Sequence, residues 1–114
     1  MNDTCIFCRI ASHELPCKSE YEDDVCLAFH DIHPRAKTHV LVIPKKHIPT
    51  LKEMEDTDEP AMGRLVKVAR DVAKKLELEH YKLLMSVGKE AGQEVFHLHL
   101  HVMSAPVGGG YQPF

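Results

Sequence analysis

The sequence lacks the features that mark a membrane protein or a binder of nucleic-acid polymers. Its longest apolar run is far shorter than the roughly 18 residues that a membrane-spanning helix needs. It has no block of five like charges, and 14 basic against 17 acidic residues leave a formal net charge of -3. We therefore expect neither a membrane partner nor a nucleic-acid polymer, and any nucleotide-like ligand should be small.

The N-terminus also lacks the pattern of a signal peptide, because no basic stretch leads into an apolar segment. We therefore expect a cytoplasmic protein, whose four cysteines would lie in a reducing compartment. The 114 residues, 44% of them hydrophobic, are enough for one core without disulfides. This predicts a single domain over 1–114, with a glycine-rich tail from about 105 to 114.

The apolar pattern predicts an α+β domain built on an antiparallel sheet. A short helix, capped by Asp3 or Thr4, should end at Ile10 or Ala11. Short runs of apolar, aromatic and β-branched residues predict five strands, the third of them ended by Pro44, over 19–21, 25–30, 39–43, 81–87 and 95–103.

A long helix is predicted between the third and fourth strands. Asp56 or Thr57 would cap it, and Pro60 lies near its first turn. Apolar residues recur at intervals of three and four and should form one buried face, comprising Met62, Leu65, Val66, Ala69, Val72, Ala73 and Leu76.

Histidine is unusually frequent, with nine residues, and three of them alternate with apolar residues over 97–102, His-Leu-His-Leu-His-Val. Strand side chains alternate between faces, so His97, His99 and His101 should share one face and the apolar residues the other. Neighbouring imidazoles can supply a nucleophile, a proton donor and a cation, a set that suits phosphate chemistry. A half-exposed strand with chance histidines is the alternative.

Two further patterns suggest ligand sites. Gly88 and Gly92 bracket a turn whose N–H groups could approach a phosphate, although a tight hairpin turn is the alternative. Cys5 and Cys8 are spaced so that both thiolates can reach one tetrahedral metal ion. A pair supplies only half of such a site, and two small buried cysteines are the alternative.

The segment 92–103, Gly-Gln-Glu-Val-Phe-His-Leu-His-Leu-His-Val-Met, resembles the signature of the histidine triad (HIT) superfamily. The segment 31–47 is similar to an upstream block of the same superfamily, and the likeness runs over about 5–103, most of all to the Hint-type nucleotide-binding proteins. It implies a HIT-like fold, with a five-stranded antiparallel sheet, one long and one short helix, and a sheet extended across a homodimer.

The resemblance also implies catalytic roles. His99 would attack the α-phosphorus of a purine nucleotide (AMP- or GMP-like) and form a covalent nucleotidyl-imidazole, which water hydrolyses. His101 would bind and polarise the phosphate oxygens, assisted by backbone amides of 88–94, and His39 would complete the cluster. Imidazolium and N–H groups can stabilise the developing charge, so this chemistry requires no metal.

The remaining nucleotide contacts follow from the same resemblance. Asp31 would bind the ribose and Ile32 would pack on the purine, although a purely loop-capping role is the alternative for Asp31. The other expected nucleotide-binding residues lie around the glycine turn, namely Ser86, Gly92, Gln93 and Glu94. Ser86 and Glu94 stand where eukaryotic Hint proteins carry Asn and Ser, which should affect substrate preference more than reaction type.

The resemblance completes a zinc site as well. In many bacterial HIT proteins, residues matching His47 and His97 join a cysteine pair such as Cys5 and Cys8 to bind zinc. Four protein ligands leave no open position, so the Zn²⁺ would be structural. It would tie the N-terminal helix to the histidine segment.

Three functions fit these expectations. The first is a phosphoramidase that cleaves the P–N bond of purine nucleoside 5′-phosphoramidates such as AMP-NH₂ or AMP-lysine. The second is hydrolysis of dinucleoside polyphosphates or nucleotidyl transfer, which would use the same His99 intermediate. The third is a nucleotide-binding regulatory module without a catalytic role.

Overall fold

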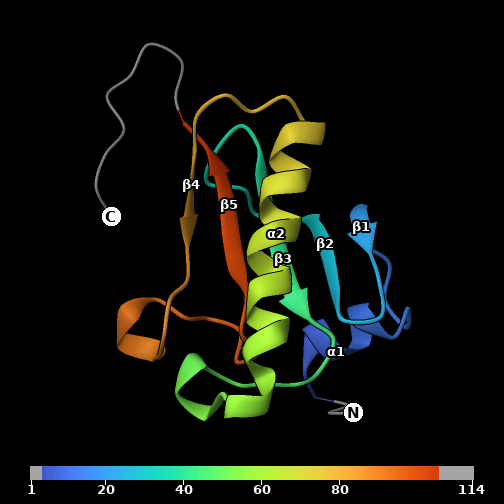
Figure 1. Ribbon diagram of the computed structural model, residues 1–114, viewed down its shortest axis with the longest axis vertical. Coiled ribbons are helices and arrows are strands. Elements are labelled where there is room, and N and C mark those ends of the chain that lie inside the picture. Colours follow the sequence, from blue (N-terminus) through green and yellow to red (C-terminus); the bar gives the residue numbers. More distant parts are fainter. Residues whose placement is uncertain (1–3, 106–114) are drawn as a thin grey trace.

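A computed structural model describes residues 4–105. Its centre is a five-stranded sheet with the order β1-β2-β3-β5-β4, in which all neighbouring strands are antiparallel. The strands are β1 Ser19–Glu22, β2 Cys26–His30, β3 His39–Pro44, β4 Tyr81–Leu84 and β5 Leu100–Ser104. The long helix α2 (Glu59–Lys75) covers one face, and the short helix α1 (Ile6–Ala11) lies behind the other (Figure 1).

The architecture confirms the predicted α+β fold. Among residues 4–105, no helix is both long and apolar enough to cross a membrane. The predicted tail lies almost wholly outside the described residues. A five-stranded antiparallel sheet with one long and one short helix is the arrangement that the HIT resemblance implies.

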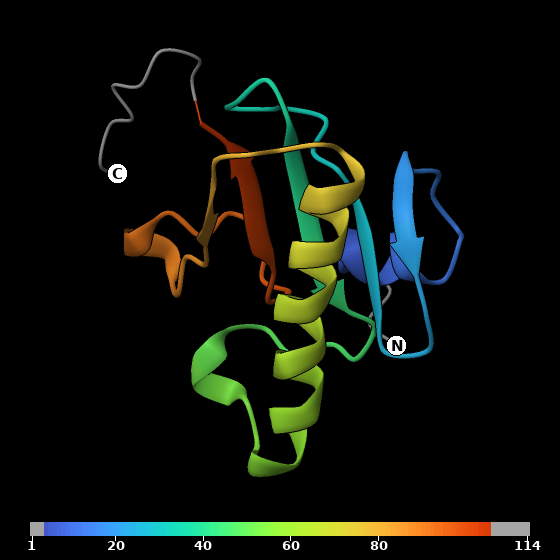
Figure 2. The same ribbon diagram turned by 45° about the horizontal axis from the view of Figure 1, so that its top comes forward.

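The sheet separates two layers of the core, and the central strand β3 contributes side chains to both. Figure 2 shows α2 on one side of the sheet and α1 on the other. Val40 and Val42 pack with the apolar face of α2. Leu41 and Ile43, which point the opposite way, pack with Phe7 of α1. All six residues of β3 are buried, since strand neighbours lie on both sides and helices cover both faces.

The long helix begins later than predicted. Asp56–Asp58 form a 3-10 turn, η2, and α2 follows with Asp58 at its N-cap and Pro60 in its first turn. The predicted burial of Val66 is wrong, because its side chain is 54% exposed. Val68 is buried instead, because it follows Leu65 by three residues and so lies closer to the same helix face.

Both strands around the glycine turn are shorter than predicted, and α1 has a different cap. β4 ends at Leu84, and β5 begins at Leu100 rather than at residue 95. The turn, which contains the 3-10 element η3 (Lys89–Ala91), carries the chain away from β4, and the N–H of Leu98 donates to the carbonyl of Ile48, 2.7 Å away. Cys5 replaces Asp3 or Thr4 as the α1 cap.

Candidate active site and metal centre

The alternation of histidine and apolar residues persists although only part of the segment is a strand. Leu98, Leu100 and Val102 pack in the core beneath α2. The histidines lie on the α1 side, where the rings of His99 and His101 are 4.8 Å apart. The rings of His97, His99, His101 and His39 are all buried. The alternative of a half-exposed strand with chance histidines is therefore wrong.

His99 has the tautomer that a nucleophile needs. Its Nδ1 lies 2.7 Å from the carbonyl oxygen of His97, which can only accept, so Nδ1 carries the proton. The lone pair is therefore on Nε2. Phe7 packs edge-to-face against the ring at a centroid distance of 5.1 Å. Burial lowers the pKa of His99 and favours the neutral ring that can attack phosphorus.

The tautomers of His39 and His101 follow from a donor in the backbone. The N–H of Arg35 donates to Nδ1 of His39 over 3.1 Å, so the proton of His39 lies on Nε2. That Nε2–H donates to Nδ1 of His101, 2.8 Å away. The proton of His101 must then lie on Nε2, where it is available to an oxygen of a ligand.

His101 is thus a neutral hydrogen-bond donor. Burial is the main cause that lowers the pKa of His101 to about 3, and the neighbouring imidazoles add to it. Burial likewise lowers the pKa of His39, while the Asp31 carboxylate opposes this shift. The site therefore offers hydrogen-bond donors without a positive charge on these two rings.

Asp31 faces both the loop and the histidines. Its Oδ1 accepts from the N–H of His33 over 2.8 Å, as the loop-capping alternative requires. Its Oδ2 lies 3.6 Å from Nε2 of His39. Ile32, beside it, is 82% exposed. The predicted contacts of Asp31 and Ile32 with ribose and purine remain predictions.

The glycine turn is held from inside by Gln93. Its buried Oε1 accepts from the N–H of Gly88, and its Nε2 donates to the carbonyls of Pro49 and Val95, all within 3.0 Å. Gly88 and Gly92 have positive φ angles of 94° and 98°, which glycine adopts without strain. The side chain of Gln93 therefore supports the turn.

The other two residues predicted around this turn differ in exposure. Ser86 is half-buried beside the turn, with its Oγ 3.8 Å from where a Cβ on Gly92 would lie. Glu94 is exposed and lines a surface cavity of about 450 Å³. A role for Ser86, Gly92, Gln93 or Glu94 in binding nucleotide remains a prediction.

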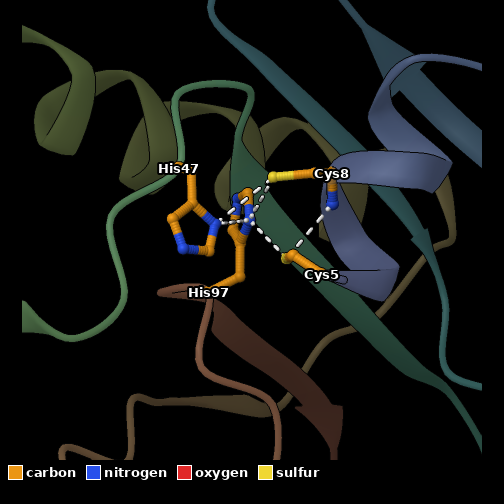
Figure 3. A group of neighbouring side chains, drawn as sticks. All are labelled: Cys5, Cys8, His47 and His97. Carbon is orange, nitrogen blue, oxygen red and sulfur yellow. Dashed lines mark hydrogen bonds between the residues drawn. The ribbon is translucent and has the colours of Figure 1, made fainter. Parts of the chain in front are cut away.

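The four residues predicted to bind zinc converge on one point (Figure 3). Their donor atoms all lie within 4.8 Å of one another. Nδ1 of His97 is 3.3 Å from Cys5 Sγ, 3.5 Å from Cys8 Sγ and 3.3 Å from Nδ1 of His47. Usual Zn–S and Zn–N bond lengths in a tetrahedron place donors about 3.3 to 3.8 Å apart, so the set fits Zn²⁺.

The protonation of His97 also fits a metal ligand. Its Nε2 donates to the carbonyl of Pro44 over 2.7 Å, which leaves the lone pair on Nδ1 facing the other donors. Burial raises the pKa of the Cys5 thiol, a cost that a bound cation would offset. Because the His97 carbonyl holds Nδ1–H of His99, one residue joins the metal centre to the candidate nucleophile.

Asp31, His39 and His101 also place three potential donor atoms within 4.8 Å. Here, however, the two imidazole nitrogens share a proton in a hydrogen bond. These two nitrogens are therefore already occupied by the hydrogen bond between His39 and His101.

Two functional neighbours escaped the sequence reasoning. Phe7 lies between the two cysteines in the sequence, in the first turn of α1, and its ring contacts both His97 and His99. Its place inside the cysteine pair was the available signal. Arg35 has no role among the sequence predictions, because no sequence pattern marks its contact with His39.

Comparison with known proteins gives consistent matches. A family model described as HIT domain matches residues 12–106. Protein HitA from Neisseria gonorrhoeae is 42% identical over 106 residues, covering 92% of this chain and 99% of that protein. The structure of a HIT family hydrolase from Clostridium thermocellum is 39% identical, with a TM-score of 0.91 and 96% of both chains covered.

A Zn-bound histidine triad family protein from Mycobacterium smegmatis is also similar, with 32% identity and a TM-score of 0.82 over 96% of this chain and 80% of that one. These matches agree with the resemblance drawn from the histidine motif. They also agree with the clustered histidines and the sheet that carries them. The chain belongs to the HIT family.

Proposed function

We propose that the protein hydrolyses the P–N bond of purine nucleoside 5′-phosphoramidates of the AMP-NH₂ or AMP-lysine type. Membership of the HIT family and similarity to a HIT family hydrolase support hydrolysis as the reaction. The observation that carries the proposal is the fixed tautomer of His99. Its Nδ1–H is bonded to the His97 carbonyl, and its Nε2 lone pair is available for attack.

In the first step, Nε2 of His99 attacks the α-phosphorus and a P–Nε2 bond forms while the P–N bond of the substrate breaks. The departing nitrogen takes a proton from water and leaves as an amine. The Nε2–H of His101 donates to a non-bridging oxygen, whose charge grows in the transition state. The Nδ1–H bond to the His97 carbonyl stabilises the positive charge that His99 gains.

In the second step, water attacks phosphorus, the P–Nε2 bond breaks and the nucleoside monophosphate leaves. The attacking water releases a proton to solvent, and His99 returns to its neutral form. With His99 on one side of phosphorus and His101 on a non-bridging oxygen, the side opposite His99 is open to the leaving nitrogen in the first step and to water in the second. The chain of hydrogen bonds from Arg35 N–H through His39 keeps the donor on His101 in place.

The four-residue donor set is part of the same proposal, with one structural Zn²⁺ held by Cys5, Cys8, His47 and His97. When bound, the ion would supply cross-linking between α1 and the segment that precedes His99, with no open position for substrate. The protein's own residues carry out the reaction described above.

Rapid quenching in alkaline denaturant, in which a phosphorus–imidazole bond survives, followed by intact-mass measurement tests the proposal. The wild type mixed with AMP-NH₂ should show an adenylylated species, and His99→Ala should show none. His80→Ala, which changes an exposed histidine, is the matched control. Turnover at the wild-type rate by His99→Ala would overturn the assignment. Faster cleavage of dinucleoside polyphosphates than of AMP-NH₂ would overturn the proposal that the leaving group is an amine. Nucleotide binding without turnover of any of these substrates would overturn the proposed hydrolysis and indicate a regulatory module.

A further inference from the structure

Neither His39 nor His101 offers a positive charge to an anionic ligand in the histidine cluster. His39 and His101 are neutral because each uses Nδ1 as an acceptor, in a chain that starts at a backbone N–H. Their neutrality therefore follows from hydrogen-bond geometry. A phosphate monoester carries up to two negative charges near pH 7. Binding it among neutral rings, with Asp31 close by, requires a positive charge from elsewhere.

Arg35 is the basic residue whose charge reaches the site. Burial is the main cause of the lowered pKa of His39 and His101, and the positive charge of Arg35 lowers both pKa values further. The negative charge of Asp31 acts on the same two rings with the opposite sign. The field at the cluster thus comes from one carboxylate and one guanidinium at the two sides of a short loop.

The position of Arg35 is fixed while its side chain stays available. Its N–H is bonded to Nδ1 of His39, which anchors the backbone four residues after Asp31 and four residues before His39. The residue is exposed. Within residues 4–105, its guanidinium takes part in none of the ion pairs, whereas most basic residues of α2 do.

A free guanidinium at this place suits one ligand chemistry. Its planar fork of N–H donors matches two oxygens of a phosphate, and such charge-assisted bonds are stronger than neutral ones. We propose that Arg35 binds the phosphate of the nucleotide and supplies the positive charge that the histidine cluster lacks. The identity of the ligand rests on the function proposed above, whereas the need for a cation rests on the tautomers.

The test compares a nucleotide with its uncharged nucleoside, using isothermal titration of AMP and adenosine into the whole protein. Arg35→Gln should weaken AMP binding about tenfold or more, since a charged hydrogen bond contributes about 1.5–3 kcal/mol. Adenosine binding should stay unchanged. The AMP affinity of Arg35→Lys should lie between those of the wild type and Arg35→Gln, because lysine keeps the positive charge and loses the planar pair of N–H donors. Lys37→Gln removes a neighbouring exposed cation and is the matched control.

Each variant keeps the backbone N–H, so the His39 tautomer and the fold are preserved and a loss is assigned to the side chain. Equal AMP affinity of Arg35→Gln and the wild type would overturn the proposal, as would an equal loss in Lys37→Gln. An equal loss for AMP and adenosine would show a structural effect and would also overturn it. If the wild type bound neither ligand, the proposed function itself would fail, which is a different result.

Discussion

Replacing Gln93, which supports the glycine turn from inside, should destabilise the protein. The side chain is buried and makes three hydrogen bonds, one from Gly88 N–H and two to the carbonyls of Pro49 and Val95. Gln93→Leu keeps the approximate volume and leaves these three backbone groups without that partner. At about 1 kcal/mol for each bond, the free energy of unfolding should fall by about 3 kcal/mol.

Differential scanning calorimetry measures this loss. For a domain of about 100 residues, about 3 kcal/mol corresponds to a fall in melting temperature of roughly 10–20 °C. Glu90→Ala, an exposed change in the same turn, should shift it by less than a few degrees and serves as control. Gln93→Glu keeps the acceptor for Gly88 and loses both donated bonds, so it should also be destabilised. A loss below about 0.5 kcal/mol for Gln93→Leu would refute the role given to this side chain.

Three other predictions concern the metal, pH and assembly. Elemental analysis should find about one zinc per chain. The double variant Cys5→Ser, Cys8→Ser should lose the zinc and melt at a lower temperature. Wild-type protein that is free of metal and equally stable would contradict the zinc site. Because His39 and His101 have lowered pKa values in the folded state, the unfolded chain binds more protons below pH 6.5. Stability is therefore fully present above that pH and should fall as pH drops toward about 3, and His101→Gln should flatten this dependence in urea titrations. Sedimentation equilibrium should show a homodimer, which charge introduced by Leu83→Asp on the exposed edge strand β4 should weaken, whereas a monomeric wild type would refute the extended sheet.

The sheet and both helices could be predicted because their signals are local. Three- and four-residue spacing indicated α2, and β-branched runs indicated β3. The start of β5 could not be predicted, because His97 and His99 alternate with apolar residues in the same way as strand residues do. His97 and His99 lie outside the strand because the glycine turn redirects the chain and the N–H of Leu98 bonds to the carbonyl of Ile48. Leu98 and Ile48 are far apart in the sequence.

The candidate site shows the same division. The motif and the resemblance named the histidines and the cysteine pair, and the structure brings each group together. Their protonation could not be predicted, because it depends on which atom faces each ring nitrogen. Only the folded chain shows that His99 faces a carbonyl whereas His39 faces the N–H of Arg35.

The contact between the N–H of Arg35 and His39 gives the backbone and the side chain of Arg35 separate roles. The proton arrangement of the His39–His101 pair is set by a peptide group, so nineteen of the twenty amino acids at position 35 would preserve it, and proline alone would abolish it. The side chain at this position can therefore change its charge and shape without disturbing the hydrogen bond between His39 and His101. Variation at position 35 is a route by which related enzymes could acquire different substrates while retaining the same chemistry.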